Sequence, residues 1–214
     1  MKPYYQDKWV TIYHGDCREI LPQLPDKSID LVLTDPPYGI GYKAFYPKQA
    51  KFSAITGDNV DTDLSFLFNL PYNLVIFGAN NMPHLLPHKG AWLCWDKRVN
   101  PKADKVIGSQ FELIWTSRKT GFQKIYRVQH GGVINDNARG MPRLHPTEKP
   151  IRLLQLILQD YPTANIILDP FFGSGTTGMA CKKLGRKCIG IEIEEKYCEI
   201  SAKRCSQMVM DLGV

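Results

Sequence analysis

The feature that most constrains the fold is one stretch in the second half of the chain, NIILDPFFGSGTTGMACKKLGRKCIGIEIEEKY. Its first apolar run ends in Asp169-Pro170 and is followed by a glycine-rich turn and a helical pattern that begins near Thr176. A second apolar run leads to Glu192. This order predicts two strands and a helix of a parallel α/β sheet, with a ligand site at the carboxyl ends of the strands.

The glycine-rich turn, Gly173-Ser174-Gly175, indicates what kind of ligand this is. Its glycines allow a tight turn and close approach to a ligand, while the following helix offers free N–H donors. In dinucleotide-binding folds, an acid about 20 residues after such a turn accepts hydrogen bonds from ribose hydroxyls, and Glu192 stands there. No Walker lysine follows the glycines. An adenosine ligand that carries no polyphosphate fits this glycine turn and acid, so the predicted cofactor is S-adenosylmethionine.

Further apolar runs predict the remaining strands of the sheet, and helical patterns lie between some of them. The predicted strands are 30–34, 74–77, 91–95, 111–115, 166–168 and 188–191, and the predicted helices are 150–161, 176–184 and 194–210. Alternating strands and helices predict a doubly wound, mostly parallel α/β sheet in a single domain, 1–214. The less regular segment 97–144 is interpreted as a small insertion or a set of active-site loops, not a second core.

The positive charge is concentrated in the middle of the chain. Residues 96–143 hold ten basic and four acidic side chains, and ten minus four is +6, the net charge of the whole chain. Such an excess favours a polyanionic partner, although a solvated surface is the simpler alternative. The candidate nucleic-acid contacts are Lys97, Arg98, Lys102 and Lys105.

The cysteines and the apolar content favour a reduced cytoplasmic protein. The six cysteines lack the close pairs of zinc sites, so no metal site is expected. Cys198 and Cys205 are expected to share one packed helix face. We expect neither a signal peptide nor a membrane span, because the most apolar region, 64–87, is interrupted by asparagines and prolines.

A second Asp-Pro stretch, LVLTDPPYGI, lies near the start of the chain. An apolar strand ends in Asp35, and two prolines fix the backbone, remove two N–H donors and leave carbonyl acceptors beside Tyr38. An ordinary strand-terminating turn would have the same appearance.

Together these stretches resemble the DNA amino-methyltransferases of the permuted class, in which the catalytic motif precedes the cofactor motif. The resemblance covers both ends and most of the chain. It assigns the segment DPPY to catalysis, HPTEKP (145–150) to closing over the cofactor, 169–177 to the glycine loop, and GIE (190–192) to the ribose. HGDC (14–17) resembles the motif whose aspartate lies near the cofactor adenine.

The resemblance implies a Rossmann-like fold and two sets of site residues. The catalytic set is Asp35, Pro36, Pro37 and Tyr38. The cofactor-binding set is Asp16, His145, Thr147, Lys149, Asp169, Pro170, Phe171, Gly173, Ser174, Gly175, Thr176, Thr177 and Glu192. Several have structural alternatives: Asp169 could cap its turn, Phe171 and Phe172 could be core residues, His145 could be packed, and Lys149 could be a surface charge.

The chemistry of an exocyclic amine explains the catalytic set. The nitrogen lone pair is delocalised into the base. Methyl transfer is easier when hydrogen-bond acceptors hold the two amine hydrogens and bring the lone pair toward the methyl group. The Asp35 carboxylate and the Pro36 carbonyl are suitable acceptors, and the prolines aim them before the substrate arrives. Tyr38 would stack on the flipped base.

Double-stranded DNA is the expected partner, and 97–144 is the segment expected to contact it and to recognise the target. Adenine N6 is the expected target, because aspartate at the head of the motif favours adenine in this family. Cytosine N4, RNA, a protein glutamine and a non-catalytic DNA-binding role are the alternatives. No membrane partner is expected. A homodimer and a restriction endonuclease partner are compatible with the sequence, which decides neither.

Overall fold

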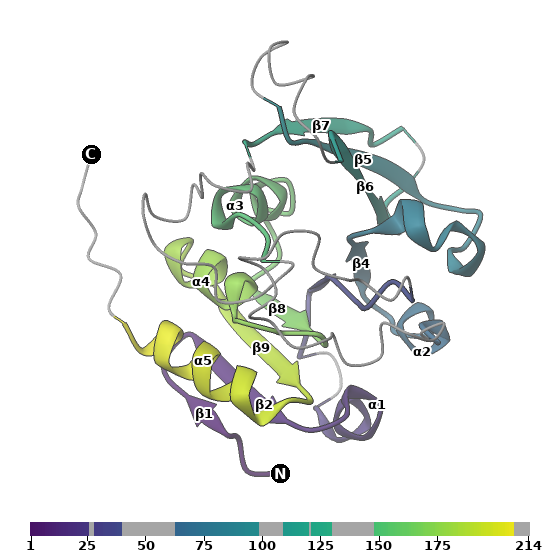
Figure 1. Cartoon of the computed structure of the whole chain (residues 1–214). Coiled ribbons are helices and arrows are strands. Elements are labelled where there is room, and N and C mark those ends of the chain that lie inside the picture. Colours follow the sequence, from purple (N-terminus) through teal and green to yellow (C-terminus); the bar gives the residue numbers. More distant parts are fainter. Residues whose placement is uncertain (26–27, 40–62, 99–108, 120, 130–147, 208–214) are drawn as a thin grey trace.

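The computed structural model describes residues 1–25, 28–39, 63–98, 109–119, 121–129 and 148–207. In these residues one sheet of nine strands has the order β1-β2-β9-β8-β3-β4-β6-β5-β7 (Figure 1). The strands are β1 (Tyr5–Gln6), β2 (Val10–His14), β3 (Leu31–Thr34), β4 (Asn73–Ile76), β5 (Ala91–Asp96), β6 (Phe111–Thr116), β7 (Lys124–Arg127), β8 (Ile166–Asp169) and β9 (Lys187–Glu192). Strands β2, β9, β8, β3 and β4 form a continuous parallel group. Only β1 and β6, among the described strands, run antiparallel to their neighbours.

Helices cover both faces of the sheet (Figure 1). The α-helices are α1 (Cys17–Ile20), α2 (Ser65–Phe68), α3 (Ile151–Gln159), α4 (Thr176–Lys183) and α5 (Glu195–Ser206), and three short 3-10 helices are η1 (Leu21–Gln23), η2 (Ala79–Asn81) and η3 (Pro83–Leu85). Helices α3, α4 and α5 pack on one face, and α1, α2 and η2 contribute to the core of the other. This arrangement confirms the predicted doubly wound, mostly parallel α/β fold.

The central strand β3 shows why the sequence has continuous apolar runs. Leu31 and Leu33 point into the core beneath α3–α5, and Val32 points into the core on the opposite face. All three are fully buried, as expected for a parallel strand with helices on both sides.

The predicted strands and helices are present, with bounds that differ by up to two residues within the described part of the chain. Residues 208–210 of the last predicted helix lie outside that part. Strands β1, β2 and β7 were not predicted from the sequence. Strands β1 and β7 lie at the two ends of the sheet and bury few side chains, so their apolar pattern is weak.

The basic segment 97–144 contributes to the same sheet in its described part. Strand β6 pairs with both β4 and β5, and β7 pairs with β5. Residues 99–108, 120 and 130–144 lie outside the described residues. The segment therefore supplies two strands to the main sheet, and its predicted role as a DNA-contact unit stays a prediction.

A buried aromatic ring fixes the start of the glycine turn. Phe172 is 3% exposed, and its N–H donates to the Ile191 carbonyl at 2.9 Å. A Cβ atom on Gly190, in the middle of β9, would lie 2.3 Å from the ring, and one on Gly178 would lie 2.8 Å from it. Phe172 is therefore a core residue, and glycine is required where β9 and α4 pass it.

The cysteines are placed as the sequence predicts. All six cysteines are free, and Cys198 and Cys205 are buried in the same core cluster, as predicted. Among the described residues, no group of three or more His, Cys, Asp or Glu side chains could hold a metal ion. None of the helices in the described ranges has the length and apolar character needed to span a membrane.

Candidate active site

Four acids stand at the carboxyl ends of four neighbouring parallel strands. Asp16 follows β2, Glu192 ends β9, Asp169 ends β8 and Asp35 follows β3. Their order across the sheet is that of the strands, although they lie far apart in the sequence (Figure 1). In open α/β sheets, ligands bind outside the carboxyl ends of the strands, so this edge is the candidate site.

Glu192 holds the glycine turn in place. Its Oε2 accepts a hydrogen bond from the Gly173 N–H at 2.7 Å, and its Oε1 accepts one from the Glu194 N–H at 2.8 Å. The side chain is buried, and burial raises the pKa of Glu192. Each oxygen keeps further acceptor capacity.

Asp169 is fully engaged inside the protein. Its Oδ1 accepts from the Thr34 hydroxyl at 2.8 Å and from the Phe171 N–H at 3.2 Å, and its Oδ2 accepts from the Thr177 hydroxyl at 2.6 Å. Asp169 thereby joins β8 to β3 and to α4. Burial raises the pKa of Asp169 to about 6.

Arg204 of α5 connects the glycine turn with the segment before α3. Its guanidinium donates to the Ser174 carbonyl and hydroxyl and to the Thr176 hydroxyl, each at 3.2 Å. It also forms an ion pair with Glu148 at 2.6 Å, and both side chains are largely buried. Gly175 lies against α5, because a Cβ atom there would be 2.9 Å from Ser201 Cβ.

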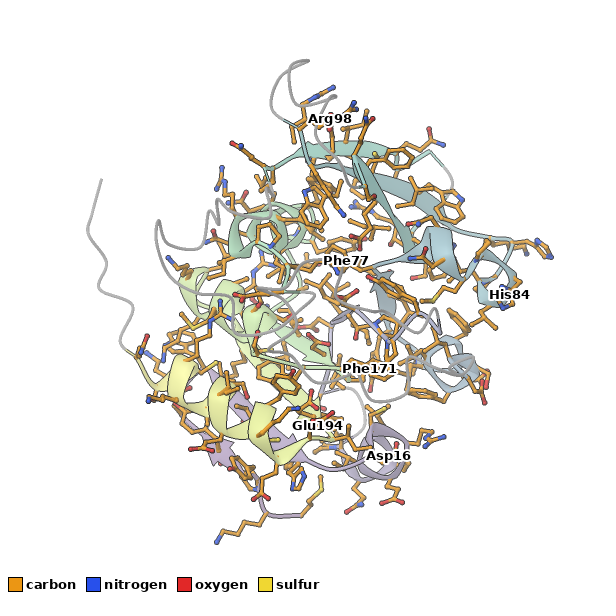
Figure 2. All side chains as sticks on the ribbon, viewed as in Figure 1. Asp16, Phe77, His84, Arg98, Phe171 and Glu194 are labelled. Atoms are coloured by element: carbon orange, nitrogen blue, oxygen red, sulfur yellow. The ribbon has the colours of Figure 1, made fainter. Side chains whose placement is uncertain are left out.

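The donors and acceptors at this end of the sheet suit an adenosine-type cofactor. The Glu192 carboxylate can accept from ribose hydroxyls, and the N-terminus of α4 has no side-chain cap. Asp16 caps α1 and pairs with Arg18 at 2.5 Å. Figure 2 shows Asp16 and Glu194 toward one end of the molecule and Arg98 toward the other.

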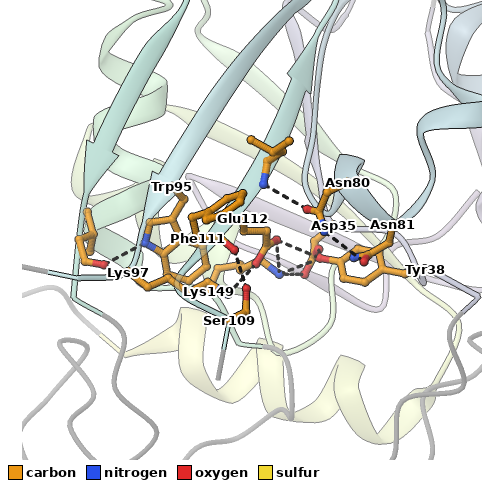
Figure 3. A network of polar contacts seen from close by, with 12 residues as sticks. Asp35, Tyr38, Asn80, Asn81, Trp95, Lys97, Ser109, Phe111, Glu112 and Lys149 are labelled. Atoms are coloured by element: carbon orange, nitrogen blue, oxygen red, sulfur yellow. Dashed lines mark hydrogen bonds and ion pairs between the residues drawn. The ribbon is translucent and has the colours of Figure 1, made fainter. Parts of the chain in front are cut away.

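A second polar network surrounds Asp35 (Figure 3). Lys149 Nζ lies 2.6 Å from Asp35 Oδ2, 3.1 Å from the Tyr38 hydroxyl and 3.4 Å from Glu112 Oε1. The Tyr38 hydroxyl donates to Asp35 Oδ1 and lies 3.1 Å from Glu112 Oε1. Lys97 pairs with Glu112 Oε2 at 3.2 Å, so the network holds two acids and two cations.

The charges in this network shift one another's pKa values. Burial, reinforced by the charge of Glu112, raises the pKa of Asp35, and Lys149 only partly offsets this. Burial alone would also raise the pKa of Glu112, but Lys149 and Lys97 hold it below its usual value. Although burial acts the other way, the two carboxylates raise the pKa of Lys149.

The prolines and Tyr38 are placed tightly. Pro36 is buried, and Pro37 is half-buried beside it. A Cβ atom on Gly78, which follows β4 with a φ of 67°, would lie 2.0 Å from the Tyr38 ring. Only glycine permits that approach.

The structure brings most of the predicted site residues to this edge of the sheet. One of them, Lys149, contacts a residue of the catalytic set. Lys149, predicted beside the cofactor, is on Asp35. Lys97 pairs with Glu112, and Arg98 bonds to Asp96 and Gln110. Pro170 is buried and Phe171 half-buried after β8. His145, Thr147, Lys102 and Lys105 lie outside the described residues.

Sequence reasoning missed Glu112, Arg204 and Gly78. Glu112 is one acid in a basic segment, and Arg204 is one cation on a charged helix, so neither has a local motif. Both acquire their place through contacts with residues far away in the chain.

The raised pKa of Asp169 gives a pH prediction. The folded-state pKa of Asp169 is about 6, whereas the ordinary pKa of an aspartate is 3.8. Its contribution to the free energy of unfolding is therefore fully present below pH ~4 and lost as the pH rises through about 6, by about 3 kcal/mol. Asp169→Asn should remove this part of the pH dependence, as measured by urea unfolding between pH 4 and 7. A stability difference between the two proteins that does not change with pH would contradict this assignment.

Comparison with known proteins agrees with this geometry. A family model described as DNA methylase, for N6 and N4 enzymes, matches residues 88–203. YubD of Escherichia coli (strain K12), which carries a methylase name, is 30% identical over 220 residues, with 93% of this chain and 92% of that protein covered. The type II methyltransferase M.HinfI of Haemophilus influenzae is 27% identical, with 97% and 71% covered.

Solved structures share the fold. The PvuII DNA methyltransferase, titled cytosine-N4-specific, has a TM-score of 0.66 at 21% identity, with 100% of this chain and 90% of that chain covered. The complex of M1.HpyAVI with SAM has a TM-score of 0.52 at 22% identity, with 92% and 100% covered. The predicted family and its S-adenosylmethionine dependence are confirmed, and the chain belongs to the N6/N4 family of DNA methylases.

Proposed function

We propose that this DNA methylase transfers a methyl group from S-adenosylmethionine to the exocyclic N6 amine of adenine in double-stranded DNA. The observation that carries the proposal is the Asp35 carboxylate, held at the end of β3 by the Pro36-Pro37 turn and by Tyr38. An aspartate at this position favours adenine over cytosine in the family that the motif resembles.

Asp35 suits the role of acceptor for the target amine. S-adenosylmethionine, when bound, supplies the electrophilic methyl group. Asp35 would accept one amine hydrogen and the Pro36 carbonyl the other, so that the nitrogen lone pair turns away from the base ring. As the new N–C bond forms, the nitrogen must lose a proton. Asp35 is a suitable acceptor for it, because its raised pKa makes it a stronger base than an exposed aspartate.

The cofactor is proposed to lie between Asp16, the glycine turn and Glu192, beside Phe171. Support comes from the position of these residues at the ends of β2, β8 and β9, next to Asp35 on β3. Asp169 and Thr177 would act indirectly, because their side chains bond to each other. Glu192 offers the acceptors that ribose hydroxyls require.

The basic segment 97–144 is proposed to contact the DNA. Its strand β6 carries Glu112 into the network around Asp35, so the segment borders the proposed site of transfer. Lys97 and Arg98 follow β5 at the same edge, although both have partners within the protein. Phosphate contacts from this segment would make DNA binding strongly dependent on salt.

Cytosine N4 is the second candidate target. The PvuII enzyme, whose title names cytosine N4, shares the fold over the full length of this chain. The product of the reaction separates the two candidates directly.

The proposed target predicts the methylated base. Duplex DNA of mixed sequence, incubated with the protein and isotopically labelled S-adenosylmethionine, should yield labelled N6-methyladenine after digestion to nucleosides and mass spectrometry. Labelled N4-methylcytosine would establish the alternative target. Absence of label in DNA, with a folded and cofactor-bound protein, would contradict catalysis of DNA methylation.

A second prediction concerns Glu192. Glu192→Gln should weaken S-adenosylmethionine binding roughly ten- to a hundred-fold by calorimetry, because hydrogen bonds to a charged group contribute about 1.5–3 kcal/mol. Glu199→Gln, an exposed change on α5, is the matched control and should leave the affinity unaltered. Equal affinities of the two variants would show that Glu192 does not contact the cofactor.

A further inference from the structure

One ammonium group lies between two carboxylates in the network around Asp35. Lys149 Nζ is 2.6 Å from Asp35 Oδ2 and 3.4 Å from Glu112 Oε1 (Figure 3). The side chains of Lys149 and Glu112 are 9% and 10% exposed, and that of Asp35 is 22% exposed. Asp35 is therefore the more accessible of the two carboxylates, and Glu112 is the more buried.

The Lys149 ammonium is bound to the same carboxylate, Asp35, that is proposed to accept a hydrogen of the target amine. Asp35 Oδ2 accepts from Lys149, and Asp35 Oδ1 accepts from Tyr38. A carboxylate has about four lone-pair sites, so an amine hydrogen could still be accepted. A cation at 2.6 Å nevertheless stabilises the charged carboxylate and makes it a weaker base. Asp35 would be a better acceptor with the ammonium elsewhere.

Glu112 is placed to receive the ammonium. Its Oε1 faces both Lys149 and the Tyr38 hydroxyl, at 3.4 and 3.1 Å. Its Oε2 is held by Lys97, whose Nζ also lies 4.7 Å from the centre of the Trp95 ring. The backbone of Glu112 is fixed opposite Trp95 in the pairing of β6 with β5. Glu112 is thus anchored, and a shift of Lys149 by under 1 Å would shorten its 3.4 Å ion pair with Glu112 to the length of its present 2.6 Å contact with Asp35.

We propose that Glu112 is a positioning residue, which takes the Lys149 ammonium from Asp35 when the target amine enters and so sets the acceptor strength of Asp35. The proposal rests on the role of Asp35 proposed above. Without Glu112, Lys149 would have Asp35 as its remaining carboxylate in this network. The amine would then compete with a permanently bound cation.

The test is the pH dependence of single-turnover methylation. The charged and titratable groups facing Asp35 are Tyr38 from its own loop, Lys149 from the segment before α3, Glu112 from β6 and Asp169 from β8. Transfer should fall at low pH as Asp35 becomes protonated, and Asp35→Asn should abolish this acid limb.

Glu112→Gln should move the midpoint of the acid limb to lower pH, since a negative charge is removed and Lys149 stays on Asp35. Its rate at neutral pH should fall by about ten-fold, because the ammonium left on Asp35 makes that carboxylate a weaker base. Lys149→Met should move the midpoint to higher pH. Glu112→Asp keeps the charge and should restore the midpoint.

Cofactor affinity and thermal stability of each variant show whether it is folded. Should Glu112→Gln fail to fold, Lys149→Met and Glu112→Asp still carry the test through the direction of their midpoints. A structural role alone would lower the rates without moving the midpoint.

Two results would overturn the proposal, and only the second would also refute the role of Asp35 as acceptor for the target amine. Unshifted midpoints in folded Glu112→Gln and Lys149→Met, with the limb absent in Asp35→Asn, would refute the role of Glu112 and leave that of Asp35 intact. A full rate and an unchanged acid limb in Asp35→Asn would refute both.

Discussion

A carboxylate that is removed from water must be hydrogen-bonded or ion-paired, and the rest of the site depends on this constraint. Parallel strands bring four acids to one edge of the sheet, where each must be hydrogen-bonded or paired. Glu192 is held by backbone N–H groups, and Asp169 by hydroxyls and one N–H group. Asp35 is held by the Lys149 ammonium and by the Tyr38 hydroxyl. Glu192, Asp169 and Asp16, which caps α1, shape the fold. In the proposal above, Asp35 has an ammonium partner that shifts away when the target amine enters.

Two consecutive residues link the two halves of the site. Glu148 pairs with Arg204, which also bonds to Ser174 and Thr176 of the glycine turn. Lys149, the next residue, pairs with Asp35. The cross-strand bond from Thr34 to Asp169 adds a second link beside it. The proposed cofactor end and the proposed transfer end of the site are therefore positioned by the same short segment and by neighbouring strands.

Much of this architecture could be predicted because its signals are local. The buried strands before Asp35 and Asp169 have continuous apolar runs, and proline and glycine mark where each strand ends. The roles of Glu112 and Arg204 in these networks, and the ion pair of Lys149 with Asp35, could not be predicted. Glu112 lies 74 residues from Tyr38, Arg204 lies 56 from Glu148, and Lys149 lies 114 from Asp35. Such contacts follow from the order of strands in the sheet, which the local pattern does not specify.

The central claim is that Asp35 accepts a hydrogen of the target amine, and single-turnover methylation by Asp35→Ala tests it most directly. Lys149 keeps Glu112 as a partner in this variant, so the network has a replacement for the lost ion pair. Loss of one preorganised polar group should slow transfer by roughly a hundred- to a thousand-fold, or about 3–4 kcal/mol, while cofactor affinity largely persists. A normal rate of methyl transfer by Asp35→Ala would contradict the account.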